Sequence, residues 1–442
     1  MKLFQQMLVA TAAMGLLAPV ATQASDVLNL DGMNDYSRSK KSSKKIDSKT
    51  FINDVNEDIA VLKGRVDGLE AHQNDIEAGA FSSTTTMDGK AIMWGGAVDG
   101  IETLGAGLTE TVQTGYTYTM NLNTSFTGDD NLYARLKAGD AGGVWGLKET
   151  YHIDRKGTSD AFKVDKLWYT FPVGENFTVF AGPRIENYYM YITPSIYKPG
   201  ALKSMKLGGN SNFGASTDVG FGFKYELDNG FAIASNVVDK SADGSGKLEG
   251  SDDSQTGGLL GEYSIRKWDT QFAYTTDRWH ASATISDAQN WTSQSYNATA
   301  LAAGMDGRDG DTLGLALRSY WRPENTGGIT PDVSVGYDIK GTDNATDGNP
   351  KEASSWFIGL SWQDILRAED RIGLAMTQPL KVSNCQGECT TTDVWPWVWE
   401  AYYAFKPNDS MEIRPALFGG TDVENAIEDD IFGAVVTTTF KF

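Results

Sequence analysis

Beyond its first two dozen residues, the sequence contains no apolar run of about 18 residues, the length that a transmembrane helix needs. Its 442 residues include only three histidines and two cysteines, and they carry no motif typical of hydrolases, zinc enzymes or phosphate-binding loops. The formal net charge of -20 leaves no excess of lysine and arginine for neutralising nucleic-acid phosphates. We therefore expect no enzyme, no metal or cofactor site, no nucleic-acid partner and no membrane-spanning helix.

The N-terminus indicates export, and export decides how the two cysteines are interpreted. A lysine precedes an apolar stretch over residues 7–20, and small residues mark a cleavage site after Ala24. Residues 1–24 are therefore predicted to be a secretory signal peptide. In an oxidising compartment, Cys385 and Cys389 are expected to form a disulfide that closes one loop.

Two segments follow the signal peptide. Residues 25–50 are rich in serine and lysine, which is typical either of a solvated periplasmic linker or of electrostatic attachment to peptidoglycan or a linked anionic polymer. Residues 51–79 carry apolar side chains at alternating spacings of three and four, which predicts a narrow helical seam and a trimerising coiled coil. A single helix packed on another domain is the alternative. The predicted oligomerisation residues are Ile52, Val55, Ile59, Leu62, Val66, Leu69, Gln73 and Ile76.

From residue 82 onward the side chains alternate with a period of two, as in strands with two different faces. Residues 116–126 place tyrosines, methionine, leucine and phenylalanine on one face and mostly uncharged polar side chains on the other. The C-terminal strand repeats the pattern. Its apolar face comprises Phe432, Ala434, Val436, Phe440 and Phe442, and its polar face comprises Thr437, Thr439 and Lys441.

Short turns and long polar loops alternate strictly between these strands. The turns include residues 173–176, and the predicted loops include residues 185–216, 239–255 and 379–394. The pattern predicts an all-β membrane protein, an antiparallel transmembrane β-barrel of about 16 strands over residues 82–442, preceded by the periplasmic coiled-coil helix. A soluble β-sandwich or propeller is the alternative, but it would need a second apolar face.

If the apolar face of each strand meets lipid, the alternate residues line the lumen. Mixed charges on opposite walls create a transverse field and a hydrated path for polar solutes. For any single residue, pairing with a charge on a neighbouring strand is the alternative. The predicted pore-lining residues are Arg135, Lys137, Lys224, Glu226, Arg318, Asp338, Glu400, Glu412 and Arg414.

The longest predicted loop is basic and rich in tyrosine, although the sequence as a whole is acidic. Folded into the lumen, this loop would narrow the pore, its cations would favour anions, and its tyrosine rings would pack against sugars. An external loop at a subunit contact is the alternative. The predicted constriction residues are Arg184, Glu186, Tyr188, Tyr189, Tyr191, Tyr197, Lys198, Lys203 and Lys206.

An ordered set of segments carries a family resemblance over residues 52–442. The set includes VLKGRVDGLEA, NTSFTGDDNLYARLKAG and the terminal DDIFGAVVTTTFKF. It resembles the cyanobacterial branch of the OprB-like, carbohydrate-selective porins. The resemblance implies a trimeric outer-membrane barrel whose third loop constricts the pore, and a C-terminal aromatic residue, here Phe442, that the assembly machinery recognises. Larger relatives carry a full S-layer-homology domain where this chain has only residues 25–50.

Two hypotheses for the function follow. The first is a passive outer-membrane channel for ions and small hydrophilic solutes, including carbohydrates or inorganic anions, to which the family resemblance adds iron species. The second is a structural protein whose barrel anchors the coiled coil and the basic segment, and so tethers the envelope. Both place the barrel in outer-membrane lipid and the N-terminal segment in the periplasm.

Overall fold

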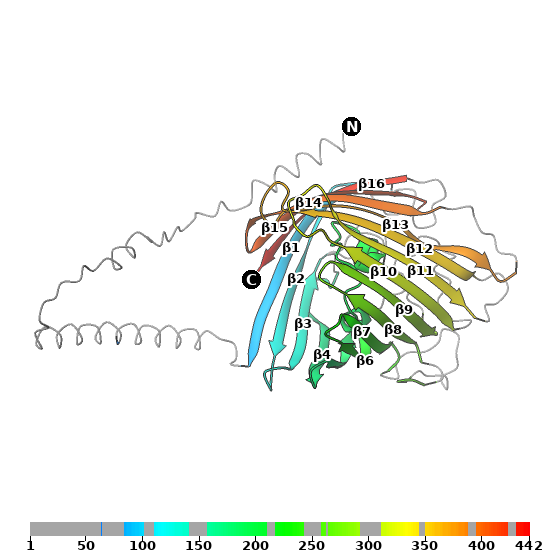
Figure 1. The fold of residues 1–442 in the computed structure, drawn as a ribbon. Coiled ribbons are helices and arrows are strands. Elements are labelled where there is room, and N and C mark those ends of the chain that lie inside the picture. The colour runs from blue at the N-terminus through cyan, green and yellow to red at the C-terminus, as the bar shows by residue number, and fades with distance from the viewer. Residues whose placement is uncertain are drawn as a thin grey trace, which may run out of the picture. The chain divides into compact units, whose positions relative to one another are not determined.

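Sixteen antiparallel strands close into a barrel, and each strand pairs with its neighbours in chain order (Figure 1). The computed structural model describes residues 63, 84–100, 110–140, 157–209, 217–242, 258–261, 264–291, 311–343, 350–387, 395–422 and 430–442. The predicted signal peptide, basic linker and coiled coil therefore lie outside the described residues, apart from Lys63, which is helical.

The strands in chain order are β1 (Thr85–Asp99), β2 (Gln113–Thr124), β3 (Asn131–Gly139), β4 (Lys163–Val173), β5 (Phe177–Ile185), β6 (Asp218–Glu226), β7 (Phe231–Asp239), β8 (Arg266–Thr275), β9 (Trp279–Gln289), β10 (Thr312–Trp321), β11 (Asp332–Thr342), β12 (Pro350–Gln363), β13 (Arg371–Cys385), β14 (Trp397–Asn408), β15 (Met411–Thr421) and β16 (Asp430–Lys441). A strand needs about 9–11 residues to cross a bilayer at a tilt, and every one of these strands reaches that length.

The last strand closes the barrel against the first, in the predicted orientation. Val435 and Thr437 are buried inside, whereas Phe432 is 40% exposed on the outer face. The ring of Phe442 stacks on that of Tyr118 in β2, with centroids 5.6 Å apart. Closure pairs every described strand on both sides, so the barrel presents no open strand edge to lipid.

The connections between strands alternate in length as the sequence predicts. The β4–β5 turn takes residues 174–176, whereas the β5–β6 loop takes residues 186–217. Two predicted loop boundaries are wrong: β13 continues to Cys385, beyond the predicted start at residue 379, and the loop after β7 continues to residue 265. Backbone pairing needs no apolar side chains, so a ladder can extend beyond the apolar belt that the sequence pattern marks.

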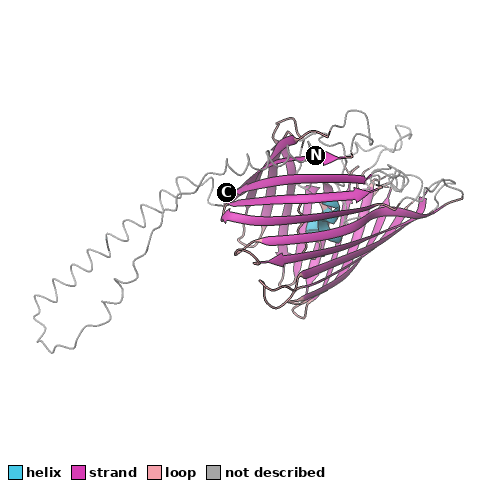
Figure 2. Cartoon of the chain, turned by 90° about the horizontal axis from the view of Figure 1, so that it is seen from above, coloured by secondary structure: helices cyan, strands magenta, loops and turns pink. Residues whose placement is uncertain are grey.

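Two short 3-10 helices lie inside the barrel (Figure 2). They are η3 (Asn187–Met190) and η4 (Lys203–Gly208), and both belong to the β5–β6 loop. The first contacts β6 and β7, and the second contacts β11, β12 and β13. The loop therefore reaches from one wall of the barrel to another. None of the helices among the described residues has the length and apolar character to cross a membrane.

Candidate functional site

Residues 186–209 of the β5–β6 loop are bonded to the inner wall at three places. We call this segment the inner loop. Its first attachment is to β8, where Asp269 accepts hydrogen bonds from the Asn187 amide, at 2.7 Å, and from the Tyr191 hydroxyl. Gln271, two residues along the same face, accepts from the backbone N–H of Ile192 at 2.8 Å and donates to its carbonyl at 3.2 Å. These buried bonds fix the start of the inner loop.

The second attachment is to β10 and β11. The Arg318 Nε donates to the carbonyl of Leu207 at 2.9 Å, and its Nη2 lies 2.7 Å from the Asp338 carboxylate. Both charged side chains are at most 1% exposed. Ser334 accepts a weaker bond from the backbone N–H of Ile196 at 3.3 Å. A buried ion pair of this kind needs further hydrogen bonds to offset its desolvation, and the loop carbonyl supplies one of them.

The third attachment is to β14. Glu400, 1% exposed, accepts hydrogen bonds from the backbone N–H groups of residues 200–202 at 2.7–2.9 Å and from the Tyr197 hydroxyl at 2.8 Å. The Tyr402 hydroxyl, on the same face, donates to the carbonyl of Lys198 at 2.5 Å. One carboxylate thereby accepts hydrogen bonds from three consecutive buried N–H groups that water cannot reach.

Apolar packing supports the same attachment. Leu202 and Met205 are fully buried in a cluster that includes Trp94 of β1, Phe357 of β12 and Phe418 of β15. The inner face is therefore apolar beneath the inner loop, which the sequence analysis did not predict. The sequence does carry a signal of this apolar inner face, because some strands, such as WVWEAYYAF of β14, have apolar residues on both faces.

A group of cations and aromatic rings surrounds the start of the inner loop. Lys166 of β4, fully buried, pairs with Glu186 and lies 4.5 Å from the centre of the Tyr189 ring. Lys206 lies 4.1 Å from the centre of the Tyr188 ring. Cation–π contacts of this kind strengthen when water is excluded. They hold the basic side chains and tyrosines of the inner loop against one another.

The sequence analysis missed Lys166 because of a local irregularity. The pairing of β3 with β4 shifts register next to Arg135, so that Asp165 and Lys166 are both buried. A β-bulge adds one residue on one strand, and strict alternation therefore assigns one of two neighbours to the wrong face. The Asp165 carboxylate pairs with Arg135.

Comparison with known proteins agrees with this geometry. Residues 48–442 match the family of carbohydrate-selective porins, OprB. The chain belongs to the OprB porin family. This porin is 24% identical over 418 residues to an uncharacterized protein of Nostoc sp., covering 87% of this chain and 70% of that protein. It is 26% identical over 413 residues to an uncharacterized protein of Synechocystis sp., covering 84% and 71%.

Solved structures share the fold of this OprB-family porin. Salmonella typhi OmpF, in its complex with daunomycin, superimposes with a TM-score of 0.51 at 12% identity, covering 81% of this chain and 97% of that chain. Vibrio cholerae OmpT without its loop L8 gives a TM-score of 0.50 at 9% identity, covering 81% and 99%. Identities this low show the fold alone. Family and fold together identify an outer-membrane porin barrel.

Within this porin barrel, many of the predicted pore-lining charges have a partner. Arg135 pairs with Asp165, Arg318 with Asp338, and Arg414 with Glu412 at 3.7 Å. The four hydrogen bonds of Glu400 make it part of the loop attachment.

The other predicted pore-lining residues lie on β3 and β6. The Lys224 ammonium lies 5.3 Å from the centre of the Phe180 ring. Lys137 lies on β3, and Glu226 is exposed at the end of β6.

Most of the predicted constriction residues lie in the inner loop. Arg184 is the exception, because it belongs to β5 and is exposed. Lys198 is exposed as well, whereas Tyr191 and Tyr197 are buried against the wall. Cys385 ends β13 and Cys389 lies outside the described residues, so the loop disulfide stays a prediction.

Proposed function

We propose that this porin forms a water-filled channel through which ions and small hydrophilic solutes, including carbohydrates and inorganic anions, diffuse passively across the outer membrane. The observation that carries the proposal is the inner loop, bonded to β8, β10 and β14 within a closed barrel. Buried charges such as Glu400 and Arg318 cost free energy unless they are fully bonded. A barrel that serves only as an anchor has no need to hold a loop across its interior at this cost.

Planar bilayer recordings test the proposal. Purified protein that migrates as a folded barrel is expected to produce discrete steps of ionic current across the bilayer, because a water-filled lumen conducts ions. Protein unfolded by heat serves as the control and is expected to give no steps. Folded protein that produces no ionic current across the bilayer would refute the channel function.

Neutralising three lysines of the inner loop is expected to reduce anion selectivity. The variant combines Lys198→Gln, Lys203→Gln and Lys206→Gln. Removing three positive charges from the inner loop should lower anion-over-cation permeability about two- to fivefold at low salt, where screening is weakest. The reversal potential in a potassium chloride gradient measures the change. Lys351→Gln, at the start of β12, is the control, and a reversal potential unchanged in the triple variant would place these lysines away from the ion path.

We also propose that the porin is a homotrimer held together in part by the helix over residues 51–79. Its heptad-like seam supports self-association. Deletion of residues 52–79 is expected to lower the temperature at which the oligomer dissociates, as measured by native gels after graded heating. A control deletion of the basic segment, residues 25–50, should leave that temperature unchanged. A trimer equally stable to heat without residues 52–79 would refute this role.

A further inference from the structure

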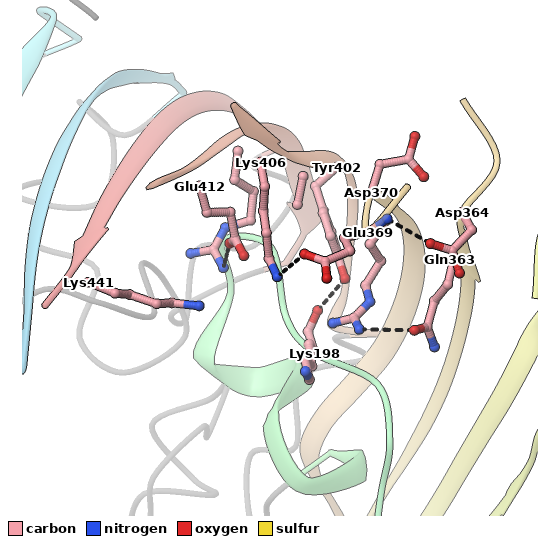
Figure 3. A pocket seen from close by; sticks show the side chains of 12 residues that line it. Lys198, Gln363, Asp364, Glu369, Asp370, Tyr402, Lys406, Glu412 and Lys441 are labelled. Atoms are coloured by element: carbon pink, nitrogen blue, oxygen red, sulfur yellow. Dashed lines mark hydrogen bonds and ion pairs between the residues drawn. The ribbon is translucent and has the colours of Figure 1, made fainter. Parts of the chain in front are cut away.

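A cavity of about 340 Å³ lies on the inner wall, at the end of the barrel that carries the short turns (Figure 3). Residues from the β12–β13 turn, the nearby ends of β12 to β16, and Lys198 of the inner loop line it. Five lining side chains are basic and four are acidic. The charge that the cavity offers a solute therefore depends on which of them have partners.

Two of the acidic side chains accept hydrogen bonds within the β12–β13 turn. Asp370 accepts hydrogen bonds from the backbone N–H groups of residues 365–367 at 2.9–3.0 Å. Asp364 accepts one from the backbone N–H of Glu369 at 2.7 Å. These hydrogen bonds fix both carboxylates within the turn, although each keeps its negative charge.

The other two acidic side chains pair with cations of the cavity. Glu369 lies 2.6 Å from the Lys406 ammonium, and Figure 3 shows this pair. Glu412 lies 3.7 Å from the Arg414 guanidinium. Two of the five cations are thereby neutralised.

Three cations of the cavity remain. In the part of the chain that the structure describes, no carboxylate forms an ion pair with Lys198, Arg371 or Lys441. Arg371 makes one long hydrogen bond, 3.5 Å from Nη2 to the Gln363 side chain. The backbone of Lys198 is fixed by the hydrogen bond that the Tyr402 hydroxyl donates to the Lys198 carbonyl. Repulsion from Arg371 lowers the pKa of Lys198 below its ordinary value.

We propose that Lys198, Arg371 and Lys441 bind the dianionic phosphate group of a solute as it passes through the channel. A guanidinium matches phosphate with two parallel hydrogen bonds, and ammonium groups add charge without a fixed direction. The three cations come from the inner loop, β13 and β16 and line the same cavity, so a dianion bound there would offset their mutual repulsion. This site deepens the proposed channel function and rests on it.

The test measures chloride current through single channels at constant chloride concentration while inorganic phosphate, glucose 6-phosphate or glucose is added. Phosphate is expected to reduce the wild-type current saturably. Arg371→Gln and Lys441→Gln should each raise the half-inhibiting phosphate concentration about tenfold or more, as expected for one lost charge-assisted hydrogen bond. Each channel is compared with its own current before addition. Arg371→Lys, which keeps the charge but loses the paired hydrogen bonds, should give an intermediate value, and Lys351→Gln, at the start of β12 and outside the cavity, should stay close to wild type.

The outcomes separate the site from the channel. Inhibition by glucose 6-phosphate as well as phosphate supports a site for any phosphate monoester, and inhibition by phosphate alone supports a site for the free ion. An open channel that is indifferent to phosphate, or one that glucose blocks equally, overturns the site but leaves the channel function standing. If the bilayer stays closed, the channel function fails, and calorimetric titration of phosphate into detergent-solubilised protein decides the site. Heat that disappears in Arg371→Gln supports it, and absence of heat in the wild type overturns it.

Discussion

Channels that carry Glu400→Ala are expected to show a higher and noisier single-channel conductance than the wild-type channel. The Glu400 carboxylate accepts four hydrogen bonds, from the Tyr197 hydroxyl and from the backbone N–H groups of residues 200–202. The substitution leaves these donors buried without an acceptor, which should weaken the attachment of the inner loop by about 3–5 kcal/mol. A loop that leaves the wall for part of the time would obstruct the lumen less and fluctuate more.

Two measurements check this expectation. Conductance reports the width of the lumen, and trypsin cleavage after Lys203 or Lys206 reports whether the inner loop has left the wall. Glu400→Gln keeps the shape but loses one oxygen acceptor, so it should give an intermediate result. Glu352→Ala is the control, because Glu352 is an exposed carboxylate of β12 outside the cavity that Lys198 lines. Wild-type conductance and wild-type protease resistance in Glu400→Ala would mean that other contacts suffice.

Gly336→Val is expected to displace η4 without opening the barrel. A Cβ atom on Gly336 would lie 1.9 Å from the carbonyl oxygen of Gly208 and 3.1 Å from Cδ of Arg318. The loop backbone cannot adjust easily, because Gly208 and Gly209 have φ angles of +74° and +106°, which other residues rarely adopt. Overpacking of this kind costs about 1–3 kcal/mol or more. The bond from Arg318 to Leu207 should be lost as η4 moves away.

Thermal unfolding and conductance together measure this effect. Gly336→Val should unfold at a lower temperature and conduct more than wild type, while still assembling as a barrel. Gly341→Ala in the same strand is the control, because the nearest atom to its added Cβ would lie 3.9 Å away. An unchanged unfolding temperature and conductance in Gly336→Val would show that the inner loop lies farther from β11 than the structure places it.

Much of the barrel could be predicted from the sequence. The alternation that ends in Phe432 outside and Thr437 inside recurs in strand after strand, and the structure confirms a closed antiparallel barrel of 16 strands. The alternation of short turns with long loops also predicted the correct number and direction of strands. Arg318 of β10 and Glu400 of β14, two residues predicted to line the pore, are both buried.

What these inner residues do could not be predicted. Arg318 and Glu400 were read as charges facing the lumen, yet both bond the inner loop, more than 100 residues away in the sequence. Lys166 was missed because a β-bulge breaks the alternation beside it. The cavity that holds Lys198, Arg371 and Lys441 brings together a loop and two strands that no sequence spacing relates.

The sequence by itself determined the barrel, and only the tertiary structure decided how its interior is filled. Lipid imposes one rule on every strand, that alternate side chains be apolar, and such a rule is visible in each short stretch of the chain. The docking of the inner loop follows no local rule. It depends on which inner residues come opposite one another once the barrel has closed, and on a glycine such as Gly336 lying where the backbone must pass.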